Sequence, residues 1–286
     1  MVRAGVQRRR RAGRLCPSRA LQRRGPLRAL QREARAGPYP GVIDVALTPA
    51  DLRGADVAVV IDVLRASTTV TQALSAGYSR VLCTDTVERA LGLRAPGRVL
   101  AGERCCVKPP GFDQGNSPLE AASRHGDELV LASTNGAPAI VAAAAHAPRV
   151  LLACLLNLGA VVGVLRDTDG DVTLVCSGTG GLVALEDVYV AGRIAATLSG
   201  ERTDAALVAQ AVARGFETAL PALAASADAA ALRAAGLEAD IGYCARESEL
   251  ALVPRVVGAS EGVAKVQAGA GVIGAAAVDG ADTVEA

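Results

Sequence analysis

Aromatic residues are scarce in this sequence. The 286 residues include two Phe, four Tyr and no Trp, yet 51% of the chain is hydrophobic. Aliphatic side chains must therefore supply the interior, and they are numerous enough for one large core or two modest lobes. We expect a folded protein rather than a disordered one.

Histidine is almost as rare, with His125 and His146 as the only two. Both stand in polar or Ala-rich stretches, away from the polar loops that follow the predicted strands. A histidine general base is therefore not expected, and each imidazole is predicted to lie at the surface.

The seven cysteines are an odd number and contain no CxxC pair. This spacing argues against both a disulfide framework and a zinc site, and it is typical of a protein in the reducing cytoplasm. No stretch reaches about 18 apolar residues without a charge, a Gly or a Pro, so we expect no membrane span. The sequence does not exclude a homo-oligomer.

Charge is distributed unevenly, although the formal net charge is +1. Residues 1–40 contain twelve Arg and a single acid, Glu33, so the rest of the chain is acidic. Such a tail could bind nucleic acid or act as a targeting arm. Its weak periodicity favours a disordered basic extension instead. We expect no nucleic-acid partner, because nothing in the acidic remainder supports one.

One strand-loop-helix unit recurs from residue 57 onward. An apolar run ends in small polar residues and leads into a helical pattern rich in Ala, Leu and Val. The predicted strands are 57–63, 80–84, 129–132, 150–154 and 172–176. Strands that alternate with helices predict an α/β fold of three layers with a largely parallel or mixed sheet, in one body or in two α/β lobes.

The predicted catalytic region covers residues 41–257. Residues 258–286 are largely small residues and Gly, so we expect a loosely ordered tail there. Segment 102–120 has no helical or strand period and is too long for an ordinary connection. It is therefore predicted to be a functional loop.

The loops at the carboxyl ends of the strands are the candidate site, because open α/β sheets bind ligands there. Ser67, Thr134 and Thr179 stand in three such loops, each before a predicted helix. The N–H groups of converging helix N-termini would suit a phosphate. The alternative for any single loop is that its hydroxyl only caps the helix.

Two familiar nucleotide motifs are excluded. The loop 177–181 contains Gly178 and Gly180, but Val183 stands where a dinucleotide-binding fingerprint needs its third Gly. No Gly-rich loop is followed by GK[ST], so the sequence also lacks a P-loop.

Carboxylates in apolar surroundings point to a cation. Glu186 and Asp187 begin a helix that is apolar around most of its circumference, with no Lys or Arg three or four residues on. We expect either a metal ion or an Arg from another loop beside them, and we favour the metal.

Asp62 ends the most hydrophobic strand, with Arg65 three residues later. The carboxylate is suited to Mg²⁺ and the guanidinium to a phosphate. An aspartyl-phosphate mechanism is the alternative, but Leu64 stands where phosphatases of that kind commonly carry a second acid. We therefore favour attack by a metal-activated water.

Seven segments carry a recognisable family pattern. They are VVIDVLRASTTV at 59–70, AGER at 101–104, GFDQGNSPLE at 111–120, STNG at 133–136, LLN at 155–157, CSGTGGLVALEDVYVAGRI at 176–194 and DIGYC at 240–244. In this order they resemble the 2-phosphosulfolactate phosphatases, known for a step in coenzyme M synthesis and also found in bacteria. The resemblance covers residues 57–257.

The resemblance implies an α/β fold, Mg²⁺ dependence and hydrolysis of the phosphate from a small anionic phosphoester that also carries carboxylate and sulfonate groups. With the chemistry above, we predict catalytic roles for Asp62, Arg65, Glu103, Arg104 and Glu186. Predicted substrate contacts are Ser67, Thr68, Lys108, Asn116, Ser117, Asn135, Gly136 and Thr179. Predicted metal ligands are Asp62, Glu186 and Asp187.

Two departures from the family pattern concern specificity. Cys105-Cys106 stand where the family usually has Gly-Gly, and Ala137-Pro138 where it often has Thr-Arg. Loss of an Arg would remove a partner for sulfonate or carboxylate. Two alternatives therefore stand beside the phosphatase of 2-phosphosulfolactate: a phosphatase with a shifted substrate, and a non-catalytic anion sensor on the same fold.

Overall fold

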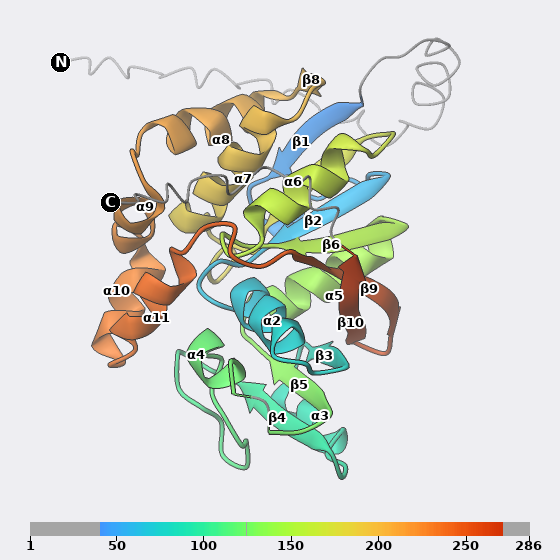
Figure 1. The fold of residues 1–286 in the computed structure, drawn as a ribbon, viewed down its shortest axis with the longest axis vertical. Helices are drawn as coiled ribbons and strands as arrows, with labels where there is room; N and C mark the ends of the chain where they lie inside the picture. Colours follow the sequence, from blue (N-terminus) through green and yellow to red (C-terminus); the bar gives the residue numbers. More distant parts are fainter. Residues whose placement is uncertain (1–40, 124, 271–286) are drawn as a thin grey trace, which may run out of the picture. The chain divides into compact units, whose positions relative to one another are not determined.

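A computed structural model describes residues 41–123 and 125–270 of the chain (Figure 1). The predicted basic extension, residues 1–40, and the last part of the predicted tail, residues 271–286, lie outside the described residues.

Strands and helices alternate along most of the described chain, as the repeated unit predicts. The strands are β1 (Val42–Ala46), β2 (Val57–Ile61), β3 (Arg80–Thr84), β4 (Arg98–Gly102), β5 (Glu128–Ala132), β6 (Arg149–Ala153), β7 (Val172–Cys176), β8 (Glu201–Arg202), β9 (Leu252–Ser260) and β10 (Val263–Ala270). The helices are η1 (Pro49–Asp51), α2 (Ala66–Ser75), α3 (Val87–Gly92), α4 (Pro118–Ala121), α5 (Gly136–His146), α6 (Leu158–Arg166), α7 (Leu185–Thr197), α8 (Asp204–Arg214), α9 (Ala219–Ala224), α10 (Ala227–Ala234) and α11 (Glu238–Cys244).

All ten strands form one sheet in the order β4-β5-β3-β10-β9-β6-β2-β7-β1-β8. Strands β4, β5 and β3 pair in parallel, and so do β6, β2, β7, β1 and β8. The hairpin of β9 and β10 lies between these two parallel blocks and pairs with each of them in antiparallel fashion. The predicted α/β fold with a mixed sheet is confirmed, as one sheet rather than two lobes.

Both faces of the sheet are buried under helices. Strand β2 shows this arrangement, because its side chains alternate between two hydrophobic cores. Val57, Val59 and Ile61 belong to the core that α6, α7 and α8 cover, whereas Ala58 and Val60 belong to the core that α2 and α5 cover. Aliphatic residues make up most of both cores, and each core contains one buried aromatic residue, Tyr189 or Tyr78.

The hairpin corrects the prediction of a loose tail from residue 258. Residues 258–260 belong to β9, and residues 263–270 form β10. Strand β10 pairs with β3 from Val263 opposite Thr84 to Val266 opposite Val81. Small side chains hide the strand pattern in the sequence, and the two neighbouring strands supply the hydrogen bonds that fix this segment in the sheet.

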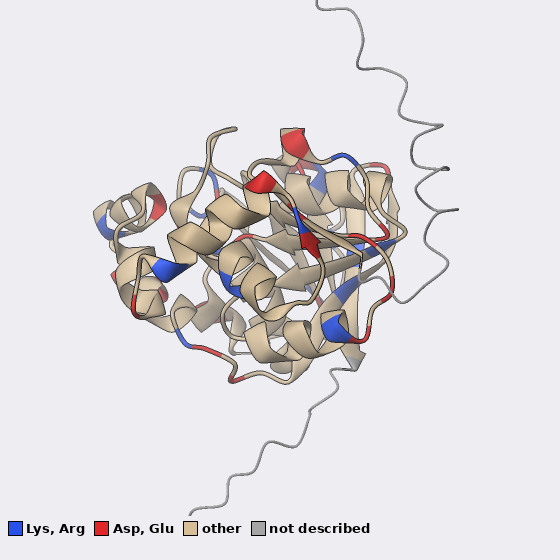
Figure 2. Cartoon of the chain, turned by 90° about the horizontal axis from the view of Figure 1, so that it is seen from above, with Lys and Arg blue, Asp and Glu red and all other residues tan. Residues whose placement is uncertain are grey.

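Basic and acidic positions are interspersed over the described ribbon (Figure 2). His125 and His146 are both exposed, as predicted. Within residues 41–123 and 125–270, no helix has the length and apolar character that would let it cross a membrane.

Candidate active site

A cavity of about 620 Å³ lies at the carboxyl ends of several strands. Its lining includes Asp62 after β2, Glu103 after β4, Thr134 after β5 and Thr179 after β7. The sequence predicted this convergence of strand-end loops. The loop 102–120 contributes Cys105, Cys106, Val107 and Asn116 to the lining, and helix α10 contributes a further part of the wall that the sequence did not predict.

Asp62 is held at the N-terminus of α2 with 7% of its surface exposed. Its Oδ1 accepts a hydrogen bond of 2.7 Å from the backbone N–H of Ala66. Its Oδ2 lies against Gly136, where an added Cβ would overlap both Oδ2 and the side chain of Ala66. Gly136 is buried and does not line the cavity, so it packs against Asp62 in place of the predicted substrate contact. Only a residue without a side chain lets α5 approach the carboxylate this closely.

Burial raises the pKa of Asp62 to about 7, with a smaller contribution from the negative charges of Asp228 and Glu103. Since two neighbouring carboxylates oppose its ionisation, a cation placed between them would lower that pKa again.

Ser67 and Thr68 have structural roles in place of the predicted substrate contacts. Both side chains are fully buried, and neither residue lines the cavity. The Ser67 hydroxyl accepts a 3.1 Å hydrogen bond from the backbone N–H of Asp62, and the Thr68 hydroxyl donates one of 2.8 Å to the carbonyl of Val63. These bonds fix the turn from β2 into α2.

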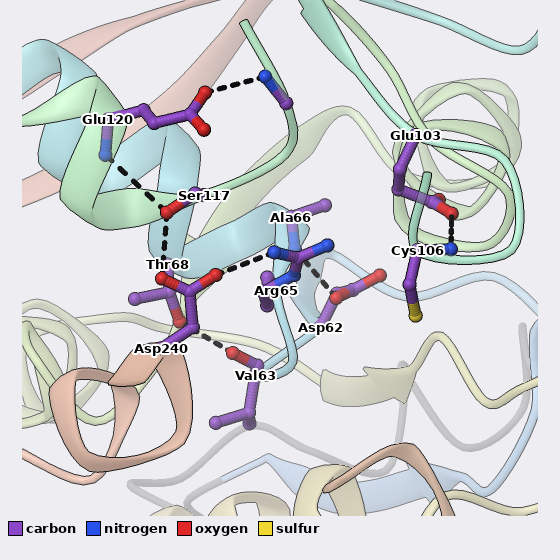
Figure 3. A network of polar contacts seen from close by, with 11 residues as sticks. Asp62, Val63, Arg65, Ala66, Thr68, Glu103, Cys106, Ser117, Glu120 and Asp240 are labelled. Atoms are coloured by element: carbon purple, nitrogen blue, oxygen red, sulfur yellow. Dashed lines mark hydrogen bonds and ion pairs between the residues drawn. The ribbon is translucent and has the colours of Figure 1, made fainter. Parts of the chain in front are cut away.

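Arg65 lines the cavity with only 4% of its surface exposed. Its Nη1 donates a 2.6 Å hydrogen bond to Oδ2 of Asp240, a buried residue of α11 (Figure 3). Oδ1 of Asp240 accepts a 2.7 Å hydrogen bond from the hydroxyl of Ser117. Ser117 therefore positions Asp240, which in turn positions Arg65, and Ser117 does not itself line the cavity.

Glu103 connects two loops. Its Oε1 accepts a 2.7 Å hydrogen bond from the backbone N–H of Thr134, and its Oε2 accepts bonds from the Thr134 hydroxyl and from the N–H of Cys106. Both carboxylate oxygens thus hold together the two loops that form part of the cavity wall.

The two other predicted cations face away from the cavity. Arg104 donates from Nη1 to the carbonyl of Glu103 and from Nη2 to the carbonyl of Asp85. Lys108 donates to the carbonyl of Asp113. The AGER motif suggested Arg104 and the long loop 102–120 suggested Lys108, but both side chains donate to backbone carbonyls and neither lines the cavity.

Thr179 is not at a helix N-terminus, because α7 begins only at Leu185. Its hydroxyl donates a 2.6 Å hydrogen bond to Oδ2 of Asp228 in α10. Oδ1 of Asn135 accepts a 3.1 Å bond from the N–H of Gly180, which joins the loop after β5 to the loop after β7. Asn116 also lines the cavity, and its Oδ1 is buried without a hydrogen-bond partner.

Glu186 and Asp187 are both buried, as predicted, but they differ in their partners. Asp187 accepts hydrogen bonds from the backbone N–H groups of Val63 and Gly178, at 2.9 and 3.1 Å. Glu186 Oε2 has no hydrogen-bond partner. Burial raises the pKa of Glu186 to about 8, with a further contribution from Asp228, and burial raises the pKa of Asp187 as well.

Known proteins with similar sequences identify the family of this chain. A family model described as 2-phosphosulpholactate phosphatase matches residues 44–259. The chain belongs to this family. It is 43% identical over 206 residues, 70% of this chain and 87% of the relative, to a probable 2-phosphosulfolactate phosphatase of Thermus thermophilus. It is 33% identical over 201 residues, 70% of this chain and 87% of the relative, to a 2-phosphosulfolactate phosphatase of Methanothermobacter thermautotrophicus.

The two departures from the family pattern lie in different surroundings. Cys105 and Cys106 line the cavity, where they were expected to influence specificity. Ala137 and Pro138, at the start of α5, do not line it. An Arg at position 138 was expected to reach the far end of a substrate, and the place of Pro138 in α5 gives no support to that expectation.

The residues around Asp62 suit a magnesium ion. Carboxylate oxygens are the ligands that Mg²⁺ prefers, and Glu186 Oε2 is a buried acceptor without a donor. Among the described residues, no three His, Cys, Asp or Glu side chains are already gathered closely enough to hold a metal. Mg²⁺ does not need three, because it usually binds one or two carboxylates and completes its shell with water and phosphate oxygens.

Asp228 and Asp240 are site residues that sequence reasoning missed. Asp228 stands in an Ala-rich helix and Asp240 in a short helix that begins with a second acid, Glu238, and both settings are typical of solvated surface positions. Asp240 stands in a segment that carries the family resemblance, DIGYC, and this was the available signal. No signal in the sequence distinguishes Asp228.

Proposed function

We propose that this chain is a magnesium-dependent phosphatase that hydrolyses a small phosphomonoester to an alcohol and phosphate. The relatives are named for 2-phosphosulfolactate, which would give sulfolactate. One observation carries the proposal: Asp62 and Arg65 line the same cavity at the end of β2, and Glu186, whose Oε2 has no hydrogen-bond partner and whose pKa is raised by burial, is close enough for the charge of Asp62 to raise that pKa further.

Asp62 and Glu186 are the residues that would hold Mg²⁺. When bound, the ion would neutralise phosphate oxygens and lower the pKa of the attacking water. Glu186 has a pKa of about 8 without a cation, so it would release a proton when the ion binds. Asp187 is better suited to holding the loop after β7 against the end of β2, because both of its oxygens accept backbone hydrogen bonds.

Arg65 would bind the phosphate through its guanidinium, since one nitrogen is fixed by Asp240 and the residue still lines the cavity. Asn116 offers a buried acceptor for a hydroxyl or a bound water. The six described cysteines are free, which fits the proposed cytoplasmic setting.

The test is phosphate release by the full-length protein from 2-phosphosulfolactate and simple phosphomonoesters, with Mg²⁺ and with excess chelator. We expect release that needs the metal and that Asp62→Asn abolishes while thermal unfolding stays cooperative. Binding of phosphoesters without any release would favour the anion sensor on the same fold. Full turnover in chelator would contradict the metal requirement.

A further inference from the structure

Two adjacent cysteines stand at the tip of a tight turn beside the cavity. The backbone N–H of Arg104 donates to the carbonyl of Val107 at 2.9 Å, and the N–H of Val107 donates to the carbonyl of Arg104 at 3.0 Å. Cys105 and Cys106 are therefore the two central residues of a hairpin turn. Their φ angles are 52° and 65°, in the left-handed region that favours glycine. The turn thus carries two thiols at positions where most turns of this kind carry no side chain of that size.

Both thiols line the cavity that contains Asp62 and Arg65. Cys105 is exposed and Cys106 is half-buried. The N–H of Cys106 donates a 3.1 Å hydrogen bond to Glu103 Oε2, which helps to hold the turn in place (Figure 3). Cys106 is also close enough to Arg65 for the charge of the guanidinium to act on its thiol. A group attached to this turn would therefore occupy space beside the cation that we propose binds phosphate.

The other described cysteines are out of reach of a reagent in solution. Four of them are fully buried, namely Cys83, Cys154, Cys176 and Cys244. Burial raises the pKa of each of these thiols, to about 12 for Cys83, so little of the reactive thiolate forms there. Burial also raises the pKa of the half-buried Cys106 thiol. Among the thiols in the described part of the chain, Cys105 is the exposed one, and we expect it to react first.

A disulfide between Cys105 and Cys106 themselves is disfavoured by distance. Neighbouring Cα atoms are about 3.8 Å apart across a trans peptide bond. Cα atoms joined by a disulfide are usually about 4.4–6.8 Å apart. Cys106 is therefore poorly placed to displace a group that is bound to the sulfur of Cys105. Such a mixed disulfide would persist until a free thiol from solution removed it.

We propose that Cys105 is a modification site at which a low-molecular-weight disulfide forms a mixed disulfide, and that the attached group closes the cavity to the phosphoester. The Cys105 thiolate, after loss of its proton to water, would attack one sulfur of R–S–S–R. A bond forms between that sulfur and Cys105, the S–S bond of the reagent breaks, and R–S⁻ leaves and takes up a proton. Cys105 is oxidised and one half of the reagent is reduced, so the exchange needs no other reactant.

A group of peptide size would fill a large part of a cavity of about 620 Å³. The inference rests on the proposed function only for the phosphoester that the cavity binds. The selectivity of the modification for Cys105 does not depend on it.

The experiment treats the full-length protein with glutathione disulfide. We expect mass spectrometry of the tryptic peptide that begins after Arg104 to place the adduct on Cys105. We expect the calorimetric Kd for 2-phosphosulfolactate with Mg²⁺ to rise, and the rate of phosphate release to fall, by at least roughly tenfold. Dithiothreitol should restore both quantities, because it removes a mixed disulfide.

The outcomes separate the inference from the proposed function. Failure of Cys105 to form the adduct, or an adduct there that leaves the Kd unchanged, would overturn the inference and leave the phosphatase intact. Loss of binding in a protein that never releases phosphate would support the inference and overturn the phosphatase. An untreated protein that binds no phosphoester would overturn both.

Cys105→Gly and Cys106→Gly are matched variants, because glycine suits the positive φ of both positions. Each variant is compared with its own untreated sample. We expect treated Cys105→Gly to keep its Kd for 2-phosphosulfolactate, and treated Cys106→Gly to lose affinity as the parent does. A loss of affinity in treated Cys105→Gly would place the effect at another cysteine and overturn the inference.

Discussion

Arg65 and Asp240 are 175 residues apart in the sequence, and their side chains form a buried ion pair at 2.6 Å. Each side chain is 3% exposed. This pair joins the turn after β2 to α11. It also fixes the direction of the Arg65 guanidinium, the one cation among the described residues that line the cavity. Ser117, from the long loop before α4, holds the second oxygen of Asp240. Three distant segments thus determine the direction of one guanidinium.

Removal of either partner of this pair should destabilise the fold and weaken phosphate binding. A buried charge that loses its partner costs about 3–5 kcal/mol. We expect Asp240→Ala and Arg65→Ala each to lower the free energy of unfolding by an amount of that order, and the double variant to lower it by less than their sum. Urea denaturation of the four proteins measures the coupling. The half-exposed pair Arg193 and Glu247 is the control and should couple more weakly.

Asp240→Asn separates positioning from folding. The amide keeps the shape and the bond from Ser117 but loses the charge opposite Arg65. We expect a rise in KM for phosphoesters, with a smaller change in kcat, while the protein still unfolds cooperatively. Unchanged KM would show that Arg65 does not depend on Asp240 for its role in binding.

Glu186→Gln should abolish metal binding and leave the fold intact. Glu186 Oε2 has no hydrogen-bond partner, so a neutral amide loses no contact there and removes a repulsion from Asp228. We expect the metal-free variant to be at least as stable as the parent, and Mg²⁺ to raise the Tm of the parent only. A Tm increase of equal size in the variant would place the ion elsewhere.

Asp187→Asn should have the opposite effect on stability. An amide can accept through one atom only, so one of the backbone N–H groups of Val63 and Gly178 would lose its acceptor. An unsatisfied buried group costs about 1–3 kcal/mol. Urea denaturation in chelator should show this loss. If Asp187→Asn were as stable as the parent while Mg²⁺ binding disappeared, Asp187 would be a metal ligand after all.

The metal-free protein should lose stability as the pH rises. Asp62 and Glu186 have folded pKa values of about 7 and 8, above the usual value of about 4 for an unfolded carboxyl. Between these values the folded state binds more protons than the unfolded chain, so the free energy of unfolding falls with increasing pH. Urea denaturation in chelator from pH 5 to pH 8 measures the slope. Asp62→Asn should flatten it, and a stability that rises over this range would contradict the burial argument.

Strands β2, β3, β5, β6 and β7 were predictable because their apolar runs are short, β-branched and bounded by polar loops, whereas β1, β4 and β8 were not predicted. Strand β7 was predicted with its observed bounds, and Asp62 was placed correctly because β2 ends just before it. The hairpin was not predictable, because its second strand, Val263–Ala270, is largely Ala, Gly and Val and owes its order to β3 and β9.

The direction in which side chains point was the second feature that could not be predicted from the sequence. Arg104 and Lys108 stand in the right loop and point away from the cavity. The pair of Arg65 and Asp240 depends on contact between segments far apart in the chain, which no local pattern records. Local spacing therefore identified the loops of the site but not all of its side chains.

The position of the C-terminal hairpin has a consequence for the newly made chain. Strands β3 and β6 have no hydrogen-bonded neighbour on their facing edges until β9 and β10 lie between them. A ribosome-bound chain that ends before residue 252 therefore carries two separate blocks of sheet, each with an open edge available to a wrong partner. Since Glu103 follows a strand of one block and Asp62 a strand of the other, the cavity can take shape only after residues 252–270 have been made.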